Sequence, residues 1–226
     1  AAPLCADAAD ALGAPLDRIT QVLGDTDRTA DAGKTSASRQ TFVSGKASEL
    51  AATDLRAQLL RHTNAGEDAE LVFEDGAVFV IEAGRRRAID LSALTANQEG
   101  DVLTGEGTFD PPTQPLDADG QGIPYATYAF AAQIALVRID TELGTVKVEK
   151  MVAAHDVGRA VNPTLVEGQI HGGIAQGLGL ALMEEYLPGR TENLHDYLIP
   201  TFGDMPQIEG LLIEDPEPLG PYGAKG

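Results

Sequence analysis

The sequence has little positive charge, a single cysteine and no long apolar run. Its 16 lysines and arginines stand against 35 aspartates and glutamates, a formal net charge of −19, and a nucleic-acid backbone or an anionic membrane would repel that charge. The one cysteine, Cys5, excludes an internal disulfide and a thiolate zinc site, and it predicts a reducing, cytoplasmic compartment. Because no run of 18 apolar residues occurs, we predict no transmembrane helix, no membrane partner and no nucleic-acid partner.

Several signature motifs are also missing. The sequence contains no Walker loop, no GxGxxG that follows a strand and no GxSxG elbow. It therefore lacks the motifs of P-loop NTPases, dinucleotide-binding enzymes and α/β-hydrolases. Cys5 has no evident base beside it, and we interpret it as a non-catalytic thiol. The histidines lack metal-ligand spacing and are interpreted as surface or hydrogen-bonded side chains: His62, His155, His171 and His195.

Length and periodicity predict an α+β fold. The chain has 226 residues, of which 43% are hydrophobic and 23% charged, enough for one large domain or two small ones. Helical and strand patterns follow one another without a regular alternation, which favours α+β over a doubly wound fold. The predicted helices cover 4–12, 46–62 and 162–186, and the predicted strands cover 19–23, 71–73, 78–81, 102–109, 127–140 and 145–154.

The segment 33–45 gathers small residues, hydroxyls, a guanidinium and an amide. Ala37, Ser38, Arg39 and Gln40 follow one another within it, and small residues leave backbone N–H groups open to a ligand. If a helix begins near Ser44, its positive end adds to the attraction for an anion. The pattern suits an anionic ligand rich in hydrogen-bonding groups, such as a phosphate or a pterin, and it suits a Ser- and Thr-rich surface loop equally well.

The predicted helix at 162–186 is rich in glycine. Asn162 caps its free amides and Pro163 occupies its first position. Each interior glycine costs roughly 1 kcal/mol relative to alanine, so another interaction must offset the loss. A bare helix face admits either a ligand or a tightly packed backbone, and both interpretations stay open. Gln169 lies on this helix with an amide that both donates and accepts. The glycines are Gly168, Gly172, Gly173, Gly177 and Gly179.

Taken together, these segments closely resemble one known family. The run from Gly168 to Gly179, preceded by Asn162-Pro163, resembles the second molybdenum-cofactor-binding half of the molybdenum hydroxylases, the xanthine dehydrogenase and aldehyde oxidase family. Ser36-Ala37-Ser38-Arg39-Gln40 is similar to the same family. The branch of bacterial aldehyde oxidoreductases is the most similar, on the segments Thr113-Gln114-Pro115-Leu116-Asp117 and Gly220-Pro221-Tyr222-Gly223-Ala224-Lys225-Gly226. The resemblance covers nearly the whole chain in order.

The resemblance implies a fold and a function. It implies an α+β molybdopterin-binding domain with mixed or antiparallel sheets and packed helices. It implies that Ser38, Arg39, Gln40, Gly168 and Gln169 hold molybdopterin, which in bacteria is often a cytosine dinucleotide. It places Ala37 beside the molybdenum, not as a ligand. Enzymes of the family hydroxylate a carbon of an aldehyde or an N-heterocycle such as a purine with oxygen from water, and their electrons leave through iron–sulfur clusters, here expected on other domains or subunits.

The resemblance also implies that parts of the enzyme lie outside the chain. Residues 1–226, with a subdivision into 1–110 and 111–226, match a fragment of the molybdopterin-binding domain. The first molybdenum-binding half and the iron–sulfur segments are absent, and they are the expected partners besides a small-molecule substrate. The family's catalytic glutamate would lie three residues beyond Gly226. The sequence therefore predicts no catalytic residue within the chain and no activity for the chain alone.

Two other classes of function stay open. A stand-alone carrier or assembly module would bind molybdopterin without catalysing a reaction. A non-catalytic scaffold domain would use its glycines for packing only, and its molybdenum content would not depend on Arg39 or Gln169.

Overall fold

A computed structural model describes residues 2–31, 33–34, 37–74 and 76–226. The described chain forms two compact units. One unit contains the described residues up to Tyr128 together with Pro216–Gly226, and the other is Ala129–Asp215. Each unit combines helices with a three-stranded sheet, so the predicted α+β class is confirmed.

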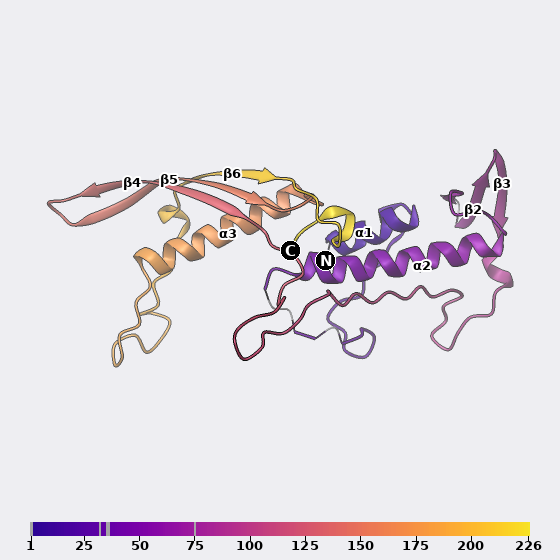
Figure 1. Ribbon diagram of the computed structural model, residues 1–226, viewed down its shortest axis with the longest axis horizontal. Coiled ribbons are helices and arrows are strands. Elements are labelled where there is room, and N and C mark those ends of the chain that lie inside the picture. The colour runs from indigo at the N-terminus through magenta and orange to yellow at the C-terminus, as the bar shows by residue number, and fades with distance from the viewer. Residues whose placement is uncertain (1, 32, 35–36, 75) are drawn as a thin grey trace. The chain divides into compact units, whose positions relative to one another are not determined.

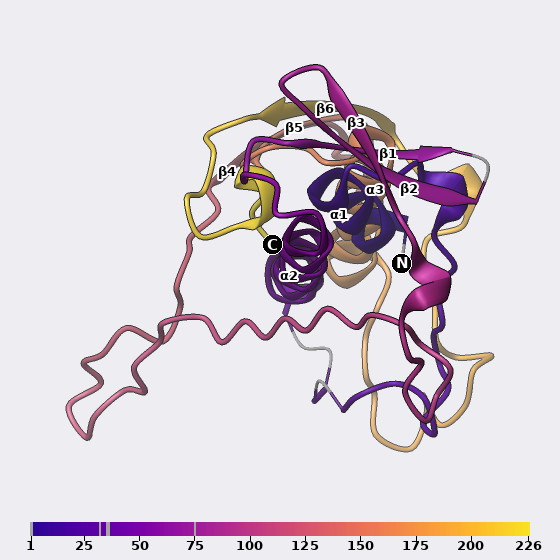
Figure 2. The same ribbon diagram turned by 90° about the vertical axis from the view of Figure 1, so that its right-hand side faces the viewer.

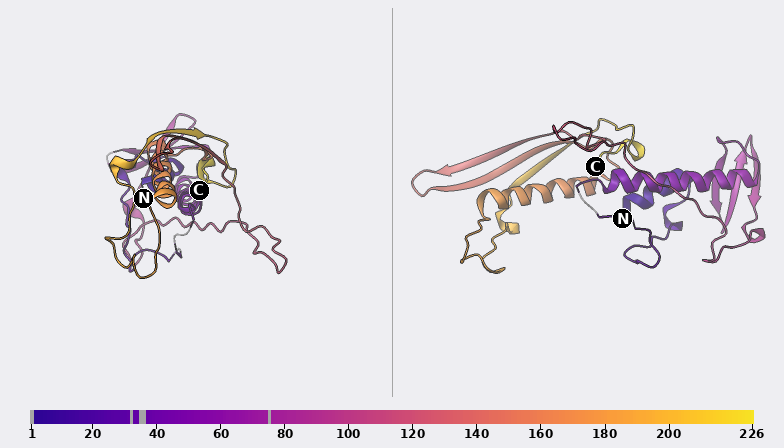
Figure 3. Two further views of the ribbon diagram at one scale, coloured as in Figure 1. Left: turned by 90° about the vertical axis from the view of Figure 1, so that its left-hand side faces the viewer. Right: turned by 60° about the horizontal axis from the view of Figure 1, so that its bottom comes forward.

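Two helices form the frame of the first unit. Helix α1 (Ala2–Leu12) packs along α2 (Lys46–His62), as Figures 2 and 3 show. Helix α1 ends where Gly13 adopts a φ of +73°, which glycine tolerates without strain. A π-helical turn, η2 (Thr41–Gly45), leads directly into α2. The predicted helices at 4–12 and 46–62 are confirmed.

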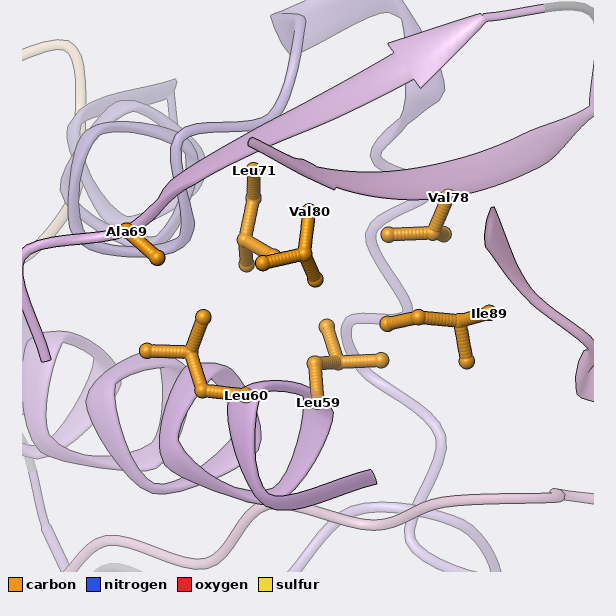
Figure 4. Close-up of a cluster of buried hydrophobic side chains, with 7 residues drawn as sticks. All are labelled: Leu59, Leu60, Ala69, Leu71, Val78, Val80 and Ile89. Carbon is orange, nitrogen blue, oxygen red and sulfur yellow. The ribbon is translucent and has the colours of Figure 1, made fainter. Parts of the chain in front are cut away.

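The sheet of the first unit packs on the end of α2. Strands β1 (Glu70–Glu74), β2 (Ala77–Glu82) and β3 (Arg85–Ile89) are antiparallel neighbours in chain order. The predicted hairpin is confirmed; Asp75 of its turn lies outside the described residues, and Gly76 has a φ of +77°. Figure 4 shows the core between sheet and helix, which is formed by Leu59, Leu60, Ala69, Leu71, Val78, Val80 and Ile89.

Two predicted strands are wrong. Residues 19–23 and 102–109 form no strand. The second segment lies on α2 instead of a sheet. Side chains of α2 form hydrogen bonds with its backbone. Gln58 Nε2 donates to the Thr104 carbonyl at 2.8 Å, and the Glu106 N–H donates to Asp54 Oδ2 at 3.2 Å. Short connecting elements complete the unit: η1 (Leu16–Arg18), η3 (Leu91–Ala93) and η5 (Pro221–Gly223).

The second unit is a mixed sheet with one long helix. Strands β4 (Ala131–Asp140) and β5 (Thr145–Asp156) are antiparallel, as predicted, and β6 (Gln207–Ile213) pairs with β5 in parallel. Helix α3 (Pro163–Leu182) packs on one face of this sheet (Figure 1). The core between them contains Met151, Ala153, Ile170 and Ile174. Sequence periodicity did not predict β6, nor the turn η4 (Phe202–Asp204) before it.

Helix α3 ends at Leu182, so the predicted extension to residue 186 is wrong. The N–H groups of Met183 and Glu184 both donate to the Gly179 carbonyl, at 2.9 and 2.8 Å. Pro200 packs on Gly179 at this point. A tertiary contact therefore ends the helix. In the described part of the chain, no helix is long and apolar enough to cross a membrane.

Candidate functional site

Residues 37–40 form an exposed loop ahead of α2. Ala37 has a φ of +54°, and the Arg39 N–H donates to the Ala37 carbonyl at 2.9 Å, which closes a tight bend. All four residues are exposed. The Arg39 guanidinium has one long contact, from Nη2 to the Lys34 carbonyl at 3.5 Å, and forms no ion pair with any described residue. Thr35 and Ser36 lie outside the described residues.

The loop leads into the positive end of a helical run. The Val43 N–H donates to the Arg39 carbonyl at 2.8 Å, which begins the run, and the N–H groups of a first helical turn have no partner within the helix. Gln40 makes no side-chain cap bond there. Phe42 is 3% exposed and packs edge-on against Phe109, with ring centroids 5.6 Å apart. The buried ring fixes the start of the helix, while the loop before it stays open to solvent.

The C-terminal segment lies against the same loop. A Cβ added to Gly226 would overlap the Ser38 carbonyl, so only a glycine backbone fits there. Pro221 and Ala224 are buried, and the Tyr222 hydroxyl donates to the Asp7 carbonyl of α1 at 3.1 Å. Burial, followed by the negative charges of nearby carboxylates, raises the pKa of Tyr222 to about 12. No sequence pattern pointed to this contact between residues 38 and 226.

The other predicted site residues lie on the first turns of α3. The Asn162 side chain accepts from the Leu165 N–H at 3.1 Å, and Pro163 occupies the first turn, as the sequence predicts. Gly168 and Gln169 are exposed. A Cβ on Gly168 would meet no atom within 4 Å among the described residues, and the same holds for Gly172, Gly173 and Gly177. The structure thus brings Ala37, Ser38, Arg39 and Gln40 together in the first unit and Gly168 with Gln169 in the second.

Gly179 differs from the other glycines of α3. A Cβ there would lie 2.5 Å from Glu184 Oε1 and 2.9 Å from Pro200 Cδ. Glycine is therefore required at position 179 for close packing, which was one of the two interpretations of the glycine-rich helix. The remaining glycines face open space and have no packing partner among the described residues.

This contrast predicts opposite effects for two neighbouring substitutions. We expect Gly177→Ala to raise the free energy of unfolding by about 0.5–1 kcal/mol, because it only improves helix propensity. We expect Gly179→Ala to lower it by about 1–2 kcal/mol, because Pro200 must shift. Urea unfolding followed by circular dichroism measures both. Equal effects, or the reverse order, would contradict the packing role of Gly179.

Two further groups bear on the chemistry of the site. Cys5 is a half-buried free thiol on α1. Asp7, on the same helix, is 1% exposed, and burial followed by the charges of Glu49 and Asp10 raises its pKa to about 6. Sequence reasoning missed Asp7, because one aspartate in an alanine-rich helix gives no sign that it faces inward. Within residues 2–31, 33–34, 37–74 and 76–226, no cluster of three His, Cys, Asp or Glu side chains could hold a metal ion.

Comparisons with known proteins agree on one family. The model of the molybdopterin cofactor-binding domain matches residues 4–206. The xanthine dehydrogenase molybdenum-binding subunit of Escherichia coli O157:H7 is 29% identical over 96% of the chain and 29% of its own length. The nicotine 6-hydroxylase large subunit of Paenarthrobacter nicotinovorans is 32% identical over 97% of the chain and 28% of its own length.

The solved structures give the same result. The crystal structure of the aldehyde oxidoreductase from Desulfovibrio desulfuricans superposes with a TM-score of 0.80 and 30% identity, over 100% of the chain and 23% of that protein. The chain therefore spans less than a third of the length of the relatives that it matches. The 37–40 loop and residues 168–169 both fall inside the matched range 4–206.

Proposed function

Because the chain belongs to the molybdopterin cofactor-binding domain family, we propose that its 37–40 loop and the start of α3 hold the molybdopterin of a molybdenum hydroxylase. The observation that carries the proposal is the exposed donor set at the loop. A guanidinium, a hydroxyl and an amide stand together, ahead of a helical run, with few partners inside the chain.

The donor set fits the chemistry of the cofactor. Molybdopterin presents a phosphate and a pterin, and Arg39 offers a planar fork of N–H donors that matches phosphate oxygens in pairs. Ser38 and Gln40 add neutral donors and acceptors, and the N–H groups at the start of the helical run add a positive end. Ala37 offers no ligand atom and little bulk, which suits a place beside a metal rather than bonded to it.

The start of α3 fits a second contact. Gly168 presents bare backbone to open space, so a ligand can approach the helix closely. The exposed Gln169 amide can donate to and accept from a pterin edge. We propose, on the resemblance, that these two residues also contact the cofactor. The nucleotide form that we propose is a cytosine dinucleotide, and the iron–sulfur clusters belong to other domains or subunits.

These residues give the chain a binding role and leave the redox chemistry to the cofactor. When bound, the cofactor would supply a molybdenum centre that accepts two electrons from the substrate carbon and passes them to the iron–sulfur clusters, while the added oxygen comes from water. The chain itself binds and orients the cofactor. Arg39 neutralises phosphate charge in a chain of net charge −19, the glycines of α3 allow close approach, and the backbone of Gly226 lies against the Ser38 carbonyl.

We propose an aldehyde as the substrate class, with N-heterocycles as the alternative. The segments 113–117 and 220–226 resemble those of aldehyde oxidoreductases, and the matched structure named above is one. Two of the relatives carry names that point to heterocycles, xanthine and nicotine. The substrate-facing residues are expected mainly outside these 226 residues, so the chemistry of the assembled enzyme decides between the two classes.

A substrate screen tests the proposed reaction. The protein is expressed from its complete gene in its native host and assayed with aldehydes, purines and pyridines in H₂¹⁸O. We expect a kcat/KM at least about tenfold higher for an aldehyde, and we expect ¹⁸O in the carboxylate product. A higher value for a purine or pyridine would support the alternative class. Product oxygen that does not come from water would contradict hydroxylase chemistry.

We expect no turnover from the 226 residues produced as a separate polypeptide. The residue that the resemblance assigns as general base is not among them, and removal of such a base alone costs about 10²–10⁴ in rate. A molybdenum-dependent rate with any aldehyde or purine, measured on this polypeptide after reconstitution with cofactor, would contradict the expectation. The protein from the complete gene serves as the positive control.

A further inference from the structure

Asp7 has a buried carboxyl group with no hydrogen-bond partner among the described residues. The residue is 1% exposed, and both of its carboxyl oxygens lack a hydrogen-bond partner in the described chain. A buried carboxylate without hydrogen bonds or a counter-charge is strongly disfavoured relative to the neutral acid. Asp7 therefore has a physical reason to stay protonated in the packed state.

Three elements enclose this carboxyl. Asp7 projects from α1, and Gly45, at the end of the π-helical turn, packs directly on it, because a Cβ at Gly45 would lie 2.8 Å from Asp7 Oδ2. The same Cβ would lie 3.0 Å from Pro221 Cγ, so η5 closes the third side. Tyr222 then ties η5 to the backbone of Asp7 itself. The carboxyl stands where α1, the π-helical turn and the C-terminal segment meet.

Two carboxylates oppose the ionisation of Asp7. From α1, Asp10 contributes a negative charge, and from α2, Glu49 contributes another. Lys46 pairs with Glu49 at 3.0 Å. From the C-terminal segment the titratable groups are Tyr222, which is neutral below its raised pKa, and Lys225, a buried cation. The π-helical turn contributes no titratable side chain.

The two segments that pack on Asp7 both reach the 37–40 loop. The π-helical turn begins at Thr41, one residue after the loop. The C-terminal segment runs from Pro221 to Gly226, whose backbone lies against Ser38. A change at Asp7 that loosens either segment therefore shifts the donors of the loop from two sides.

We propose that Asp7 is a positioning residue for the 37–40 loop, and that it packs the π-helical turn and the C-terminal segment beneath the loop only while its carboxyl is protonated. Ionisation favours a looser arrangement, because the charge is stabilised only if water reaches it between α1 and η5. The effect on cofactor retention rests on the proposed function; the effect on the packing of the two segments does not.

The direction of the pH dependence follows from the pKa of Asp7. It is about 6 in the folded chain, against 3.8 for an unperturbed aspartate. A raised carboxyl pKa means that the packed state holds the proton more tightly, so the packing is complete below about pH 4 and is lost as pH rises through 6. The two segments should therefore be more protected in acid than at pH 8.

Hydrogen exchange read by mass spectrometry tests the proposal directly. The protein is expressed from its complete gene, and exchange is followed in peptides that cover 37–45 and 217–226, with rates corrected for the intrinsic effect of pH. We expect about tenfold or more slower exchange at pH 5 than at pH 8, with a midpoint near 6. Asp7→Asn, which imitates the neutral acid, should be protected at both pH values. Asp10→Asn, at an exposed position of the same helix, should keep a transition, with its midpoint moved to lower pH because one of the charges that raise the pKa of Asp7 is removed.

A second variant keeps the test decisive if Asp7→Asn does not fold. Glu49→Gln removes one of the charges that raise the pKa of Asp7, so the midpoint should move to lower pH. A transition that is unchanged in Asp7→Asn, or one that Glu49→Gln does not shift, would overturn the proposal. Cofactor release, measured as free molybdenum against pH, should follow the same midpoint. If hydrogen exchange shows the pH transition but cofactor release does not, the positioning role of Asp7 stands and the assignment of the loop to the cofactor fails.

Discussion

Replacement of Arg39 by alanine is expected to remove most of the bound cofactor. The guanidinium is exposed, and its one contact among the described residues is at 3.5 Å to the Lys34 carbonyl, so its donors are available to a phosphate. Each charge-assisted hydrogen bond contributes about 1.5–3 kcal/mol, and a paired contact therefore changes affinity by about a hundredfold or more. We expect the molybdenum content of the purified Arg39→Ala protein to fall at least about tenfold, as measured by elemental mass spectrometry with the pterin quantified separately.

Two matched variants separate this effect from general loss of charge. Arg85→Ala removes another exposed arginine, on β3, and should leave molybdenum and pterin unchanged. Arg39→Lys keeps the charge but loses the fork, so an intermediate content is expected. The free energy of unfolding of Arg39→Ala should change by less than about 0.5 kcal/mol, because the side chain is exposed. Full cofactor content in Arg39→Ala would show that the loop does not bind molybdopterin.

Gly107→Ala is expected to lower the stability of the first unit strongly. A Cβ at this position would overlap the Ala47 carbonyl and the Ala51 N–H group, and it would lie 2.9 Å from the Leu50 carbonyl carbon. These are backbone atoms of α2, which cannot turn aside as the tip of a flexible side chain can. We expect the free energy of unfolding to fall by about 2–4 kcal/mol. The substitution also lowers the conformational entropy of the unfolded chain, but this raises the free energy of unfolding by only about 0.4–1 kcal/mol.

Urea unfolding followed by circular dichroism measures this loss, and Gly210→Ala serves as the control. Gly210 lies in β6, and a Cβ there would meet no described atom within 4 Å. The control should match the original protein or exceed it slightly. An unfolding midpoint for Gly107→Ala equal to that of the original protein would contradict the close packing of residues 105–107 on α2.

Short sequence patterns predicted many of the helices and strands correctly. The leucine spacing at 46–62, the Asp-Gly turn between two β-branched runs and the Asn-Pro start of α3 are short-range signals, and the elements that they predict are confirmed. The failures depend on distant contacts. Residues 102–109, predicted as a strand, hydrogen-bond instead to side chains of α2, and α3 ends where Pro200 packs on Gly179. Nothing within either segment encodes its distant partner.

The candidate site divides in the same way. The residue types at 37–40 suited an anionic ligand and a surface loop equally well, and the resemblance named the cofactor. The glycine-rich helix left two interpretations open, and the structure favours packing at Gly179 alone. The buried carboxyl of Asp7 and the contact of Gly226 with Ser38 join residues that are far apart in sequence, so no local pattern could have predicted them.

Native mass spectrometry of the protein expressed from its complete gene in its native host is the most direct test of cofactor binding. The native mass is compared with the denatured masses of the same sample. We expect the native mass to exceed the sum of the covalent masses by at least one molybdenum-bearing molybdopterin, and we expect Arg39→Ala to lose that excess. A native mass that is fully accounted for by polypeptide and other prosthetic groups, in a sample free of molybdenum and pterin, would contradict the central claim that this domain holds the cofactor.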